Sequence, residues 1–254
     1  MEIKGIDVSK WQGRIDWKKA AESGVRFAMI KALQGLSPDP RFEENAKGAA
    51  DNGIYAGAYV FSLAKDPDEA EAEAEAALDA CAPYNITWPV AMDFEGAHFE
   101  KMKKSERGAI ITAFCERIKR GGMIPMLYSN RDWFTRLIPV SVRDEYPVWL
   151  AQWRAEKPDT GFEYAMWQSG AGSVGGIEGD VDIDTSYVDF SLFSRPQASF
   201  RLTRPRSRGE AYLMMQRALN AAGYRSLDGR PLKEDGVWGK KSREAFLKML
   251  KANE

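Results

Sequence analysis

Two acidic side chains, Asp93 and Glu95, interrupt the end of an apolar run at residues 88–96. Residues 90–94 are enough for a buried strand and too few for a typical helix. Alternate residues of a strand point to the same side, so the two carboxylates are expected to project together. Burying neighbouring carboxylates is costly unless one holds a proton, and the pKa values of the pair are then pushed apart. A protonated acid beside an ionised one suits cleavage of a glycosidic bond.

The spacing Asp-x-Glu is common, and a strand-end pair bonded to loop amides would share it. Two further acids favour catalysis. Asp7 lies near the end of a predicted strand at residues 3–8, and Asp182 follows a glycine-rich loop at residues 170–179. The active site of an α/β barrel is assembled from several strand ends, so carboxylates that converge there indicate a catalytic site. Asp184 is the alternative to Asp182, since either side chain could face inward.

Residue types that are rare in the chain narrow the chemistry further. His98 is the only histidine, so a zinc site built on histidines is nearly excluded. A Ser-His-Asp or Cys-His arrangement would have to use His98, which we interpret as a loop residue at the rim of a groove. Gly-x-Ser-x-Gly, a Walker phosphate loop and a dinucleotide fingerprint are absent. Carboxylates remain for catalysis, and neither a metal nor a cofactor is expected.

Strands and helices alternate over roughly the first 190 residues. The alternation indicates parallel pairing, and at this length a closed barrel is the economical arrangement. The last two strands have no convincing helix between them, so an irregular barrel is expected. The acidic helix at residues 66–82 is expected to turn its glutamates to solvent. Strands are predicted at residues 3–8, 26–33, 54–61, 90–94, 124–129, 147–153 and 164–169, and helices at residues 16–24, 39–53, 66–82, 105–120, 131–137, 210–222 and 240–250.

The composition is that of a globular chain with two parts. The chain has 254 residues, of which 44% are hydrophobic and 29% are charged. Residues 194–208 contain prolines and basic residues without periodicity, and are predicted to link a catalytic domain at residues 1–193 to a small helical domain at residues 209–254. Residues 201–254 carry 13 Lys and Arg against 6 Asp and Glu, a net charge of +7. This charge indicates a polyanionic partner or a solvated basic surface.

The start of the chain lacks a charged-then-apolar signal, and no apolar run approaches the length that spans a membrane. We therefore expect synthesis in the cytoplasm and no membrane partner. Cys81 and Cys115 lie far apart in the sequence, and without a secretory context they are predicted to be free, buried thiols.

Six short motifs occur in the order and approximate spacing of one enzyme family, and together they are specific although each alone is common. They are Gly5-Ile6-Asp7-Val8-Ser9 with Trp11-Gln12, Asp93-Phe94-Glu95, Tyr128-Ser129, Trp149-Leu150-Ala151-Gln152-Trp153, Trp167-Gln168 and Val181-Asp182. On these motifs, the part of the chain before the linker resembles the glycoside hydrolase family 25 lysozymes, the muramidases common in phage endolysins.

The resemblance implies an irregular (β/α)5(β)3 barrel that hydrolyses the β-1,4 bond from N-acetylmuramic acid to N-acetylglucosamine. Glu95 would be the general acid, with its pKa raised by surrounding negative charge. Asp93 would stay ionised, orient the N-acetyl group of the substrate and stabilise the positive intermediate formed by attack of that group. Asp7 and Asp182 would hold the site electrostatically and help to position sugar or water. An inverting mechanism, in which one carboxylate activates water, is the alternative.

Six residues are candidates for the sugar groove: Lys31, Tyr59, Phe61, Tyr128, Trp153 and Gln168. For each aromatic residue among them, core packing is the alternative. Bacterial peptidoglycan is the expected partner, nucleic acid is not expected, and a monomer is assumed. The alternative functions are a carbohydrate-binding barrel that has lost catalysis and a hydrolase of chitin-like chains.

The tail is similar to the small helical peptidoglycan-binding domains of cell-wall hydrolases. The similarity rests on residues 216–220, on Gly223-Tyr224 and on residues 235–239, and Gln216 is expected to face inward from the first tail helix. The habit of phage lysis enzymes implies storage in the host cytoplasm and holin-dependent release to the cell wall.

Overall fold

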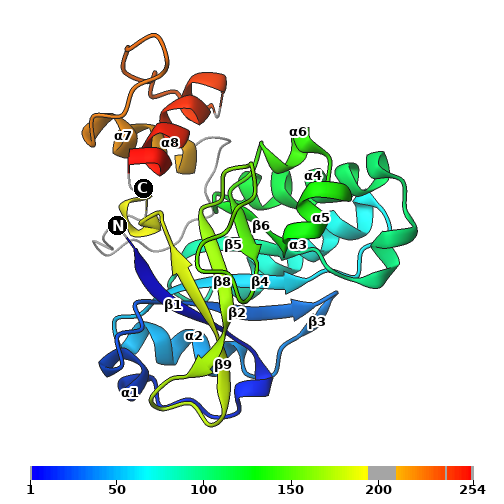
Figure 1. The fold of residues 1–254 in the computed structure, drawn as a ribbon, viewed down its shortest axis with the longest axis vertical. Coiled ribbons are helices and arrows are strands. Elements are labelled where there is room, and N and C mark those ends of the chain that lie inside the picture. The colour runs from blue at the N-terminus through cyan, green and yellow to red at the C-terminus, as the bar shows by residue number, and fades with distance from the viewer. Residues whose placement is uncertain (1, 194–209, 238, 253–254) are drawn as a thin grey trace.

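Eight strands of the described part of the chain close into a barrel (Figure 1). The computed structural model describes residues 2–193, 210–237 and 239–252. The strands follow the order β1-β9-β8-β7-β6-β5-β4-β2 around the barrel, and pairing of β1 with β2 closes the sheet. The short strand β3 (Ser37–Pro38) extends the edge of β2. The barrel strands are β1 (Ile3–Val8), β2 (Phe27–Gln34), β4 (Tyr55–Phe61), β5 (Ile86–Asp93), β6 (Pro125–Asn130), β7 (Val148–Ala151), β8 (Met166–Ser173) and β9 (Asp180–Ser186).

The strand directions are those of the expected irregular (β/α)5(β)3 barrel. Strands β1, β2, β4, β5, β6, β7 and β8 run parallel, whereas β9 runs antiparallel to both β8 and β1. Residues 152–165, between β7 and β8, contain no helix. The carboxyl ends of the parallel strands therefore share one rim, which we call the mouth. Helices follow the first five parallel strands: α1 (Trp17–Glu22), α2 (Phe42–Asp51), α3 (Pro67–Cys81), α4 (Lys104–Arg120), and α5 (Arg131–Arg136) with α6 (Val140–Arg143).

Side-chain caps start two helices where the sequence predicts them. The carboxylates of Asp16 and Asp66 accept backbone hydrogen bonds at the starts of α1 and α3. Helix α2 begins later than the predicted start at Asp39. Asp39 lies in a turn before the helix, where its Oδ1 accepts a hydrogen bond from the backbone N–H of Arg41 at 2.9 Å and its Oδ2 accepts one from the backbone N–H of Lys10 at 3.1 Å. Asp39 thus ties together the loops that follow β1 and β2 at the mouth.

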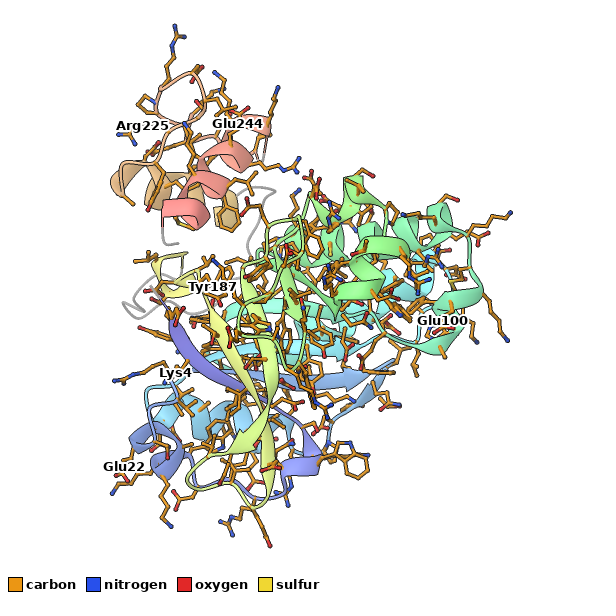
Figure 2. The ribbon with its side chains drawn as sticks, viewed as in Figure 1. Lys4, Glu22, Glu100, Tyr187, Arg225 and Glu244 are labelled. Carbon is orange, nitrogen blue, oxygen red and sulfur yellow. The ribbon has the colours of Figure 1, made fainter. Side chains whose placement is uncertain are left out.

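Large side chains fill the barrel interior, so it is a core and not a pore. The rings of Phe27 and Trp88 stack with centroids 4.4 Å apart. A β-carbon at Gly5 would lie 2.4 Å from the Phe27 ring, so glycine at this position of β1 leaves the room that Phe27 occupies. Nearer the mouth, Trp149 packs edge-on against Tyr128 at 4.5 Å. Figure 2 shows side chains filling both the barrel and the layer between its strands and helices.

Two further predictions from the sequence are wrong. The predicted loop at residues 170–179 is partly strand, because β8 continues to Ser173 and forms a hairpin with β9. Pairing with β9 gives the backbone groups of this segment hydrogen-bond partners. The glutamates of α3 do not all face solvent, because Glu73 is only 3% exposed. Its carboxylate accepts hydrogen bonds from Ser62 Oγ at 2.6 Å and from the backbone N–H of Leu63 at 2.8 Å.

Cys81 and Cys115 are free and buried, as predicted. None of the helices in the described residues is both long enough and apolar enough to cross a lipid bilayer.

Helices α7 (Glu210–Ala221) and α8 (Lys240–Ala252) form a small tail unit beside the N-terminus, at the end of the barrel opposite the mouth (Figure 1). Helix α7 contacts the short helix η3 (Phe190–Phe193), which follows β9. In Figure 2, Arg225 and Glu244 are labelled on the tail unit, and Tyr187 lies at the barrel end nearest to it. The predicted linker at residues 194–208 and Trp238 of the tail motif lie outside the described residues.

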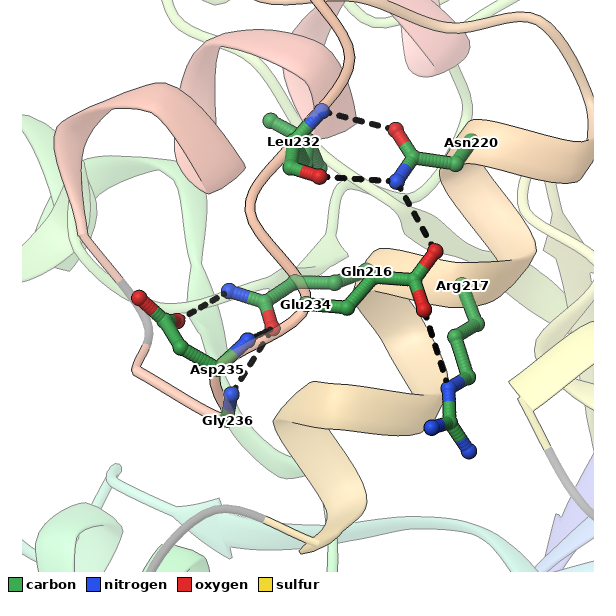
Figure 3. A network of polar contacts seen from close by, with 7 residues as sticks. All are labelled: Gln216, Arg217, Asn220, Leu232, Glu234, Asp235 and Gly236. Carbon is green, nitrogen blue, oxygen red and sulfur yellow. Dashed lines mark hydrogen bonds and ion pairs between the residues drawn. The ribbon is translucent and has the colours of Figure 1, made fainter.

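Gln216 of α7 organises the tail unit (Figure 3). Its side chain faces inward as predicted and is 1% exposed. Its Oε1 accepts hydrogen bonds from the backbone N–H groups of Asp235 at 3.1 Å and Gly236 at 2.9 Å. Its Nε2 donates to the carbonyl oxygen of Val237 at 2.9 Å. Because a buried amide must be satisfied at both ends, these bonds hold the turn before α8 against α7.

Candidate active site

Asp93 and Glu95 lie at the mouth, and backbone contacts with β6 fix their positions. β5 ends at Asp93, whose side chain is 5% exposed. Phe94 turns outward into the layer between strands and helices. Its N–H donates to the carbonyl oxygen of Tyr128 at 2.9 Å, and its own carbonyl oxygen accepts a hydrogen bond from Ser129 Oγ at 2.7 Å. Glu95 therefore emerges beyond the strand end and is exposed.

Asp93 and Glu95 were predicted to project to the same side, but their side chains differ in exposure. The pKa of each carboxyl is raised. Burial raises the pKa of Asp93 well above its usual value, and the charge of Glu95 raises it further. Partial desolvation also raises the pKa of Glu95, although the residue is exposed. The pair therefore favours a state in which it shares a proton.

Lys31 of β2 is the cation that faces this pair. Its charge lowers the pKa of both Asp93 and Glu95, against the effect of burial. Lys31 Nζ lies 5.0 Å from the centroid of the Phe61 ring and donates a hydrogen bond to Gln34 Oε1 at 3.4 Å. Lys31 and Phe61 thus form the wall of the mouth on the side of β2 and β4.

A second group of carboxyls lies on β1 and β9. Their antiparallel register places Asp7 opposite Asp182 and Gly5 opposite Asp184, so Asp182 and Asp184 share one face of β9. Asp182 and Asp184, of which the sequence analysis expected one or the other to face inward, therefore both face inward. Asp182 is partly exposed, whereas Asp184 lies deeper and is 0% exposed. Burial first, and then the charge of Asp182, raise the pKa of Asp7 to about 7.

Gln168 of β8 connects the acids to the aromatic residues. Its Oε1 accepts hydrogen bonds from Tyr128 Oη at 3.1 Å and from Trp153 Nε1 at 2.9 Å. Because an indole N–H can only donate, the amide orientation is fixed and Nε2 faces the carboxyls. Nε2 donates to Asp7 Oδ2 at 2.8 Å and to Asp182 Oδ2 at 3.5 Å. Gln168 is 4% exposed, so the structure places it behind the acids as their support.

The aromatic groove candidates divide between the core and the surface. Tyr59 and Tyr128 both pack edge-on against Trp149, with centroids 6.0 and 4.5 Å away. Burial raises the pKa of both phenols well above the usual value. Trp153 is 51% exposed and Phe61 is partly exposed. Tyr59 is partly exposed like Phe61, whereas Tyr128 is buried. Trp153, Phe61 and Tyr59 therefore offer ring surface at the mouth that a sugar could contact.

Residues 6–177, more than half of the chain, match the family described as glycosyl hydrolases family 25. The chain belongs to glycosyl hydrolase family 25. It is therefore a glycoside hydrolase, and the predicted family and fold are confirmed. The matched residues include Asp7, Asp93, Glu95 and Gln168, whereas Asp182 follows just after them.

The family 25 barrel is similar to two lysozymes and to an uncharacterized protein. Lysozyme M1 of Streptomyces globisporus is 32% identical over 197 residues, which are 71% of this chain and 66% of that protein. The uncharacterized protein YegX of Escherichia coli O6:H1 is 32% identical over 191 residues, 72% of this chain and 68% of that one. The crystal structure of the bacterial lysozyme from Streptomyces coelicolor matches with a TM-score of 0.57 and 28% identity, covering 72% of this chain and 91% of that chain. The match thus spans about two thirds of the two curated relatives' length.

Trp149 and Asp184 make a contact in the family 25 barrel that the sequence analysis missed. Trp149 Nε1 donates a hydrogen bond to Asp184 Oδ1 at 2.8 Å. The signal for it in the sequence was weak, because most buried tryptophans find an acceptor for their N–H but Trp88 of β5 has none among the described residues. Asp184, two residues after Asp182 and on the same face, supplies the acceptor for Trp149.

A cleft of about 760 Å³ lies elsewhere on the molecule, between the family 25 barrel and α8. Tyr164, Trp167 and Tyr187 of the barrel and Arg243 and Phe246 of α8 are among its lining residues. The cleft contains none of the candidate catalytic carboxyls, so the chemistry of the side chains, and not cavity size, locates the site at the mouth. No group of three His, Cys, Asp or Glu side chains in the described residues is arranged to hold a metal ion.

Proposed function

We propose that the family 25 barrel is a muramidase that hydrolyses the β-1,4 bond between N-acetylmuramic acid and N-acetylglucosamine in bacterial peptidoglycan. Family membership and the similarity to Lysozyme M1 support this activity. The observation that carries it to this site is the carboxyl pair at the mouth, in which Asp93 is buried, Glu95 is exposed and both pKa values are raised. Such a pair supplies the proton donor and the anionic partner that glycoside cleavage needs.

Glu95 is the general acid of the proposed reaction. Its exposure at the mouth lets its carboxyl reach the oxygen of a bound glycosidic bond. Partial desolvation of that carboxyl, and the charge of Asp182, raise its pKa and so keep the proton available closer to neutral pH. Glu95 gives this proton to the leaving oxygen as the bond from that oxygen to the anomeric carbon breaks.

Asp93 is the proposed partner of the substrate's N-acetyl group. Its Oδ1 is buried and has no hydrogen-bond partner among the described residues. An N–H donor from the N-acetyl group would satisfy this oxygen and turn the acetyl oxygen toward the anomeric carbon. That oxygen then attacks the anomeric carbon as the leaving sugar departs, and water, activated by the ionised Glu95, later opens the intermediate with overall retention.

The burial of Asp93 changes one part of the mechanism expected from the sequence. From the sequence, we expect Asp93 to stay ionised. Burial of the Asp93 carboxyl instead favours its neutral form in the protein without substrate. A hydrogen bond from the substrate N–H favours the ionised form instead. Substrate binding therefore moves the shared proton from Asp93 to Glu95, where the reaction uses it.

Comparing two substrates tests the proposed activity. The full chain is incubated with purified peptidoglycan and, separately, with soluble chitin oligomers, and new reducing ends are counted. Release from peptidoglycan with little or none from chitin oligomers is expected. Equal or faster release from chitin oligomers would assign the barrel to chitin-like chains. No release from either substrate would leave a barrel that only binds carbohydrate.

We also propose that the tail unit binds the cell wall. Residues 209–254 carry nine Lys and Arg against six Asp and Glu, a net charge of +3, and four arginines of the predicted linker raise this to +7 for residues 201–254. Peptidoglycan-associated polymers are polyanionic. Leu227 and Val237 are 72% and 63% exposed on this unit. Co-sedimentation of the full chain with purified walls is expected to weaken with salt and in the Leu227→Ser/Val237→Ser variant. Leu192→Ser, at an exposed leucine of η3, is the matched control and should sediment as the unchanged protein does.

The proposal takes the chain as a monomer. A single species of about 28.5 kDa in size-exclusion chromatography with light scattering is expected. A larger species would contradict it.

A further inference from the structure

The carboxyl of Asp184 lies inside the barrel, beneath the proposed site, and only one of its oxygens has a donor. The residue is 0% exposed. Oδ1 accepts a hydrogen bond from Trp149 Nε1 at 2.8 Å. Oδ2 is buried and receives no N–H or hydroxyl donor from the described residues. An ionised carboxylate in this setting would keep an unsatisfied, negatively charged oxygen in the protein interior, which is costly.

The group that interacts with Asp184 from β1 is the carboxyl of Asp7. Asp184 pairs with Gly5 in the register of β1 and β9, so Asp7 is the next inward residue along β1 and lies diagonal to Asp184. Burial first, and then the charge of Asp7, raise the pKa of Asp184. Two ionised carboxylates at these neighbouring positions in the barrel interior would repel each other, and neither would have a proton to donate. One of the two must carry a proton, and Asp184 is the deeper.

Asp7 is held from the other side as well. Gln168 Nε2 donates to Asp7 Oδ2 at 2.8 Å, and the orientation of that amide is fixed by Tyr128 and Trp153. An acid at Asp184 would therefore give Asp7 a donor from β9 in addition to the donor from β8. Asp7 would then be an oriented carboxylate at the mouth with two donors, although Asp182 stands opposite it.

We propose that Asp184 is a carboxylic acid at neutral pH, that it donates a hydrogen bond to Asp7, and that it thereby positions Asp7 at the mouth. Trp149 holds Asp184 in the orientation that this bond requires. The positioning role rests on the proposed muramidase function, in which Asp7 helps to position sugar or water. The protonation of Asp184 is a property of the protein without substrate and is measured separately.

The first experiment follows the side-chain carboxyl carbons of labelled aspartates by NMR during a pH titration of the full chain and of Asp184→Asn, which also identifies the Asp184 signal. We expect no deprotonation of Asp184 at neutral pH. We also expect the pKa of Asp7 to be similar in Asp184→Asn, because the amide N–H replaces the acid O–H as donor. Deprotonation of Asp184 in the acid range, with a fall in the Asp7 pKa when its charge is removed, would overturn the proposal.

A second variant separates positioning from packing. Asp184→Leu removes the donor, so the pKa of Asp7 should rise and kcat/KM on peptidoglycan should fall by about tenfold or more. Asp184→Asn should recover most of that loss. Equal losses in both variants, or no loss in Asp184→Leu, would overturn the positioning role. If Asp184→Leu does not fold, the titration and the activity of Asp184→Asn decide. An inactive wild type would count against the muramidase function, and the titration would still decide the protonation of Asp184.

Discussion

Gln168 donates a hydrogen bond from Nε2 to Asp7 Oδ2 over 2.8 Å, joining residues 161 positions apart in the chain. The two residues lie on β8 and β1, and β9 stands between these strands in the barrel. The bond therefore reaches across β9. Asp7, Asp182 and Gln168 come together only when the barrel is closed. Gln168 therefore links the closure of the barrel to the position of a proposed catalytic acid.

Replacing Gln168 with leucine is expected to lower both stability and activity. The substitution removes the donor to Asp7 and leaves Tyr128 and Trp153 without their acceptor. Losing buried hydrogen bonds, one of them to a charged group, should lower the free energy of unfolding by about 2 kcal/mol. Urea unfolding measures this, and Gln34→Leu, at an exposed glutamine, is the matched control. Equal unfolding midpoints for both variants would contradict the role of Gln168.

Raised carboxyl pKa values predict that stability falls as pH rises from about 4 to 7. In this window folded Asp7, with a pKa of about 7, still holds a proton that the unfolded chain has released. The stability contributed by that proton is fully present below the pKa of Asp7 in the unfolded chain, and it is lost as pH rises to the pKa of Asp7 in the folded protein. For one group, the free energy of unfolding changes by at most about 1.4 kcal/mol per pH unit.

Asp7→Asn removes this contribution, so its free energy of unfolding should depend less on pH across the same window. Urea unfolding at several pH values between about 4 and 7.5 tests the prediction. Asp132→Asn serves as the control, because Asp132 is bonded to Arg136 and its pKa is lowered, which places its effect at more acid pH. A steeper pH dependence in Asp7→Asn would be incompatible with the raised pKa.

Glu73 is predicted to stabilise the loop after β4 and, through it, the catalytic strand. Its carboxylate binds Ser62 and Leu63, and the backbone N–H of Ser62 donates to the carbonyl oxygen of Asp93 at 3.1 Å. Glu73→Ala should lower the free energy of unfolding by about 1–3 kcal/mol, because buried donors lose their acceptor. Glu71→Ala, which removes an exposed ion pair from the same helix, should cost at most about 1 kcal/mol. Thermal unfolding that ranks the variants in the reverse order would refute this.

Trp153 is predicted to contribute a stacking surface for sugar. Its ring is 51% exposed, while its N–H is held by Gln168. Trp153→Ala should raise KM on peptidoglycan fragments by about tenfold through loss of ring contact. Trp153→Phe keeps a ring without the N–H and should recover most of the affinity. An unchanged KM in Trp153→Ala would place the substrate elsewhere in the mouth.

The architecture and the gathering of the acids were predictable because they depend on local patterns. Alternating strands and helices indicate parallel pairing, and parallel strands bring Asp7 and Asp93 to one rim. Glu95 is placed by the same rule, since it lies two residues after Asp93. The prediction that these acids meet at one mouth needed no knowledge of side-chain contacts.

The environment of each acid was not predictable, because it depends on contacts between distant residues. The contrast between buried Asp93 and exposed Glu95 arises because β5 ends at Asp93, a boundary fixed by pairing with β6. The hydrogen bonds of Gln168 and the burial of Glu73 depend on which side chains of other elements lie opposite them. A glutamate in an acidic helix gives no local sign that a serine and a backbone N–H will meet it.

The most direct test of the account measures release of new reducing ends from purified peptidoglycan by the full chain and by Glu95→Gln, with identification of the sugar at each new end. We predict muramic acid ends, with a rate at least about a hundredfold lower in Glu95→Gln, because the amide cannot donate the catalytic proton. Glu100→Gln, at an exposed glutamate just beyond the site, is the control and should keep the wild-type rate. Undiminished release by Glu95→Gln would contradict the account and move the acid to Asp93 or Asp182.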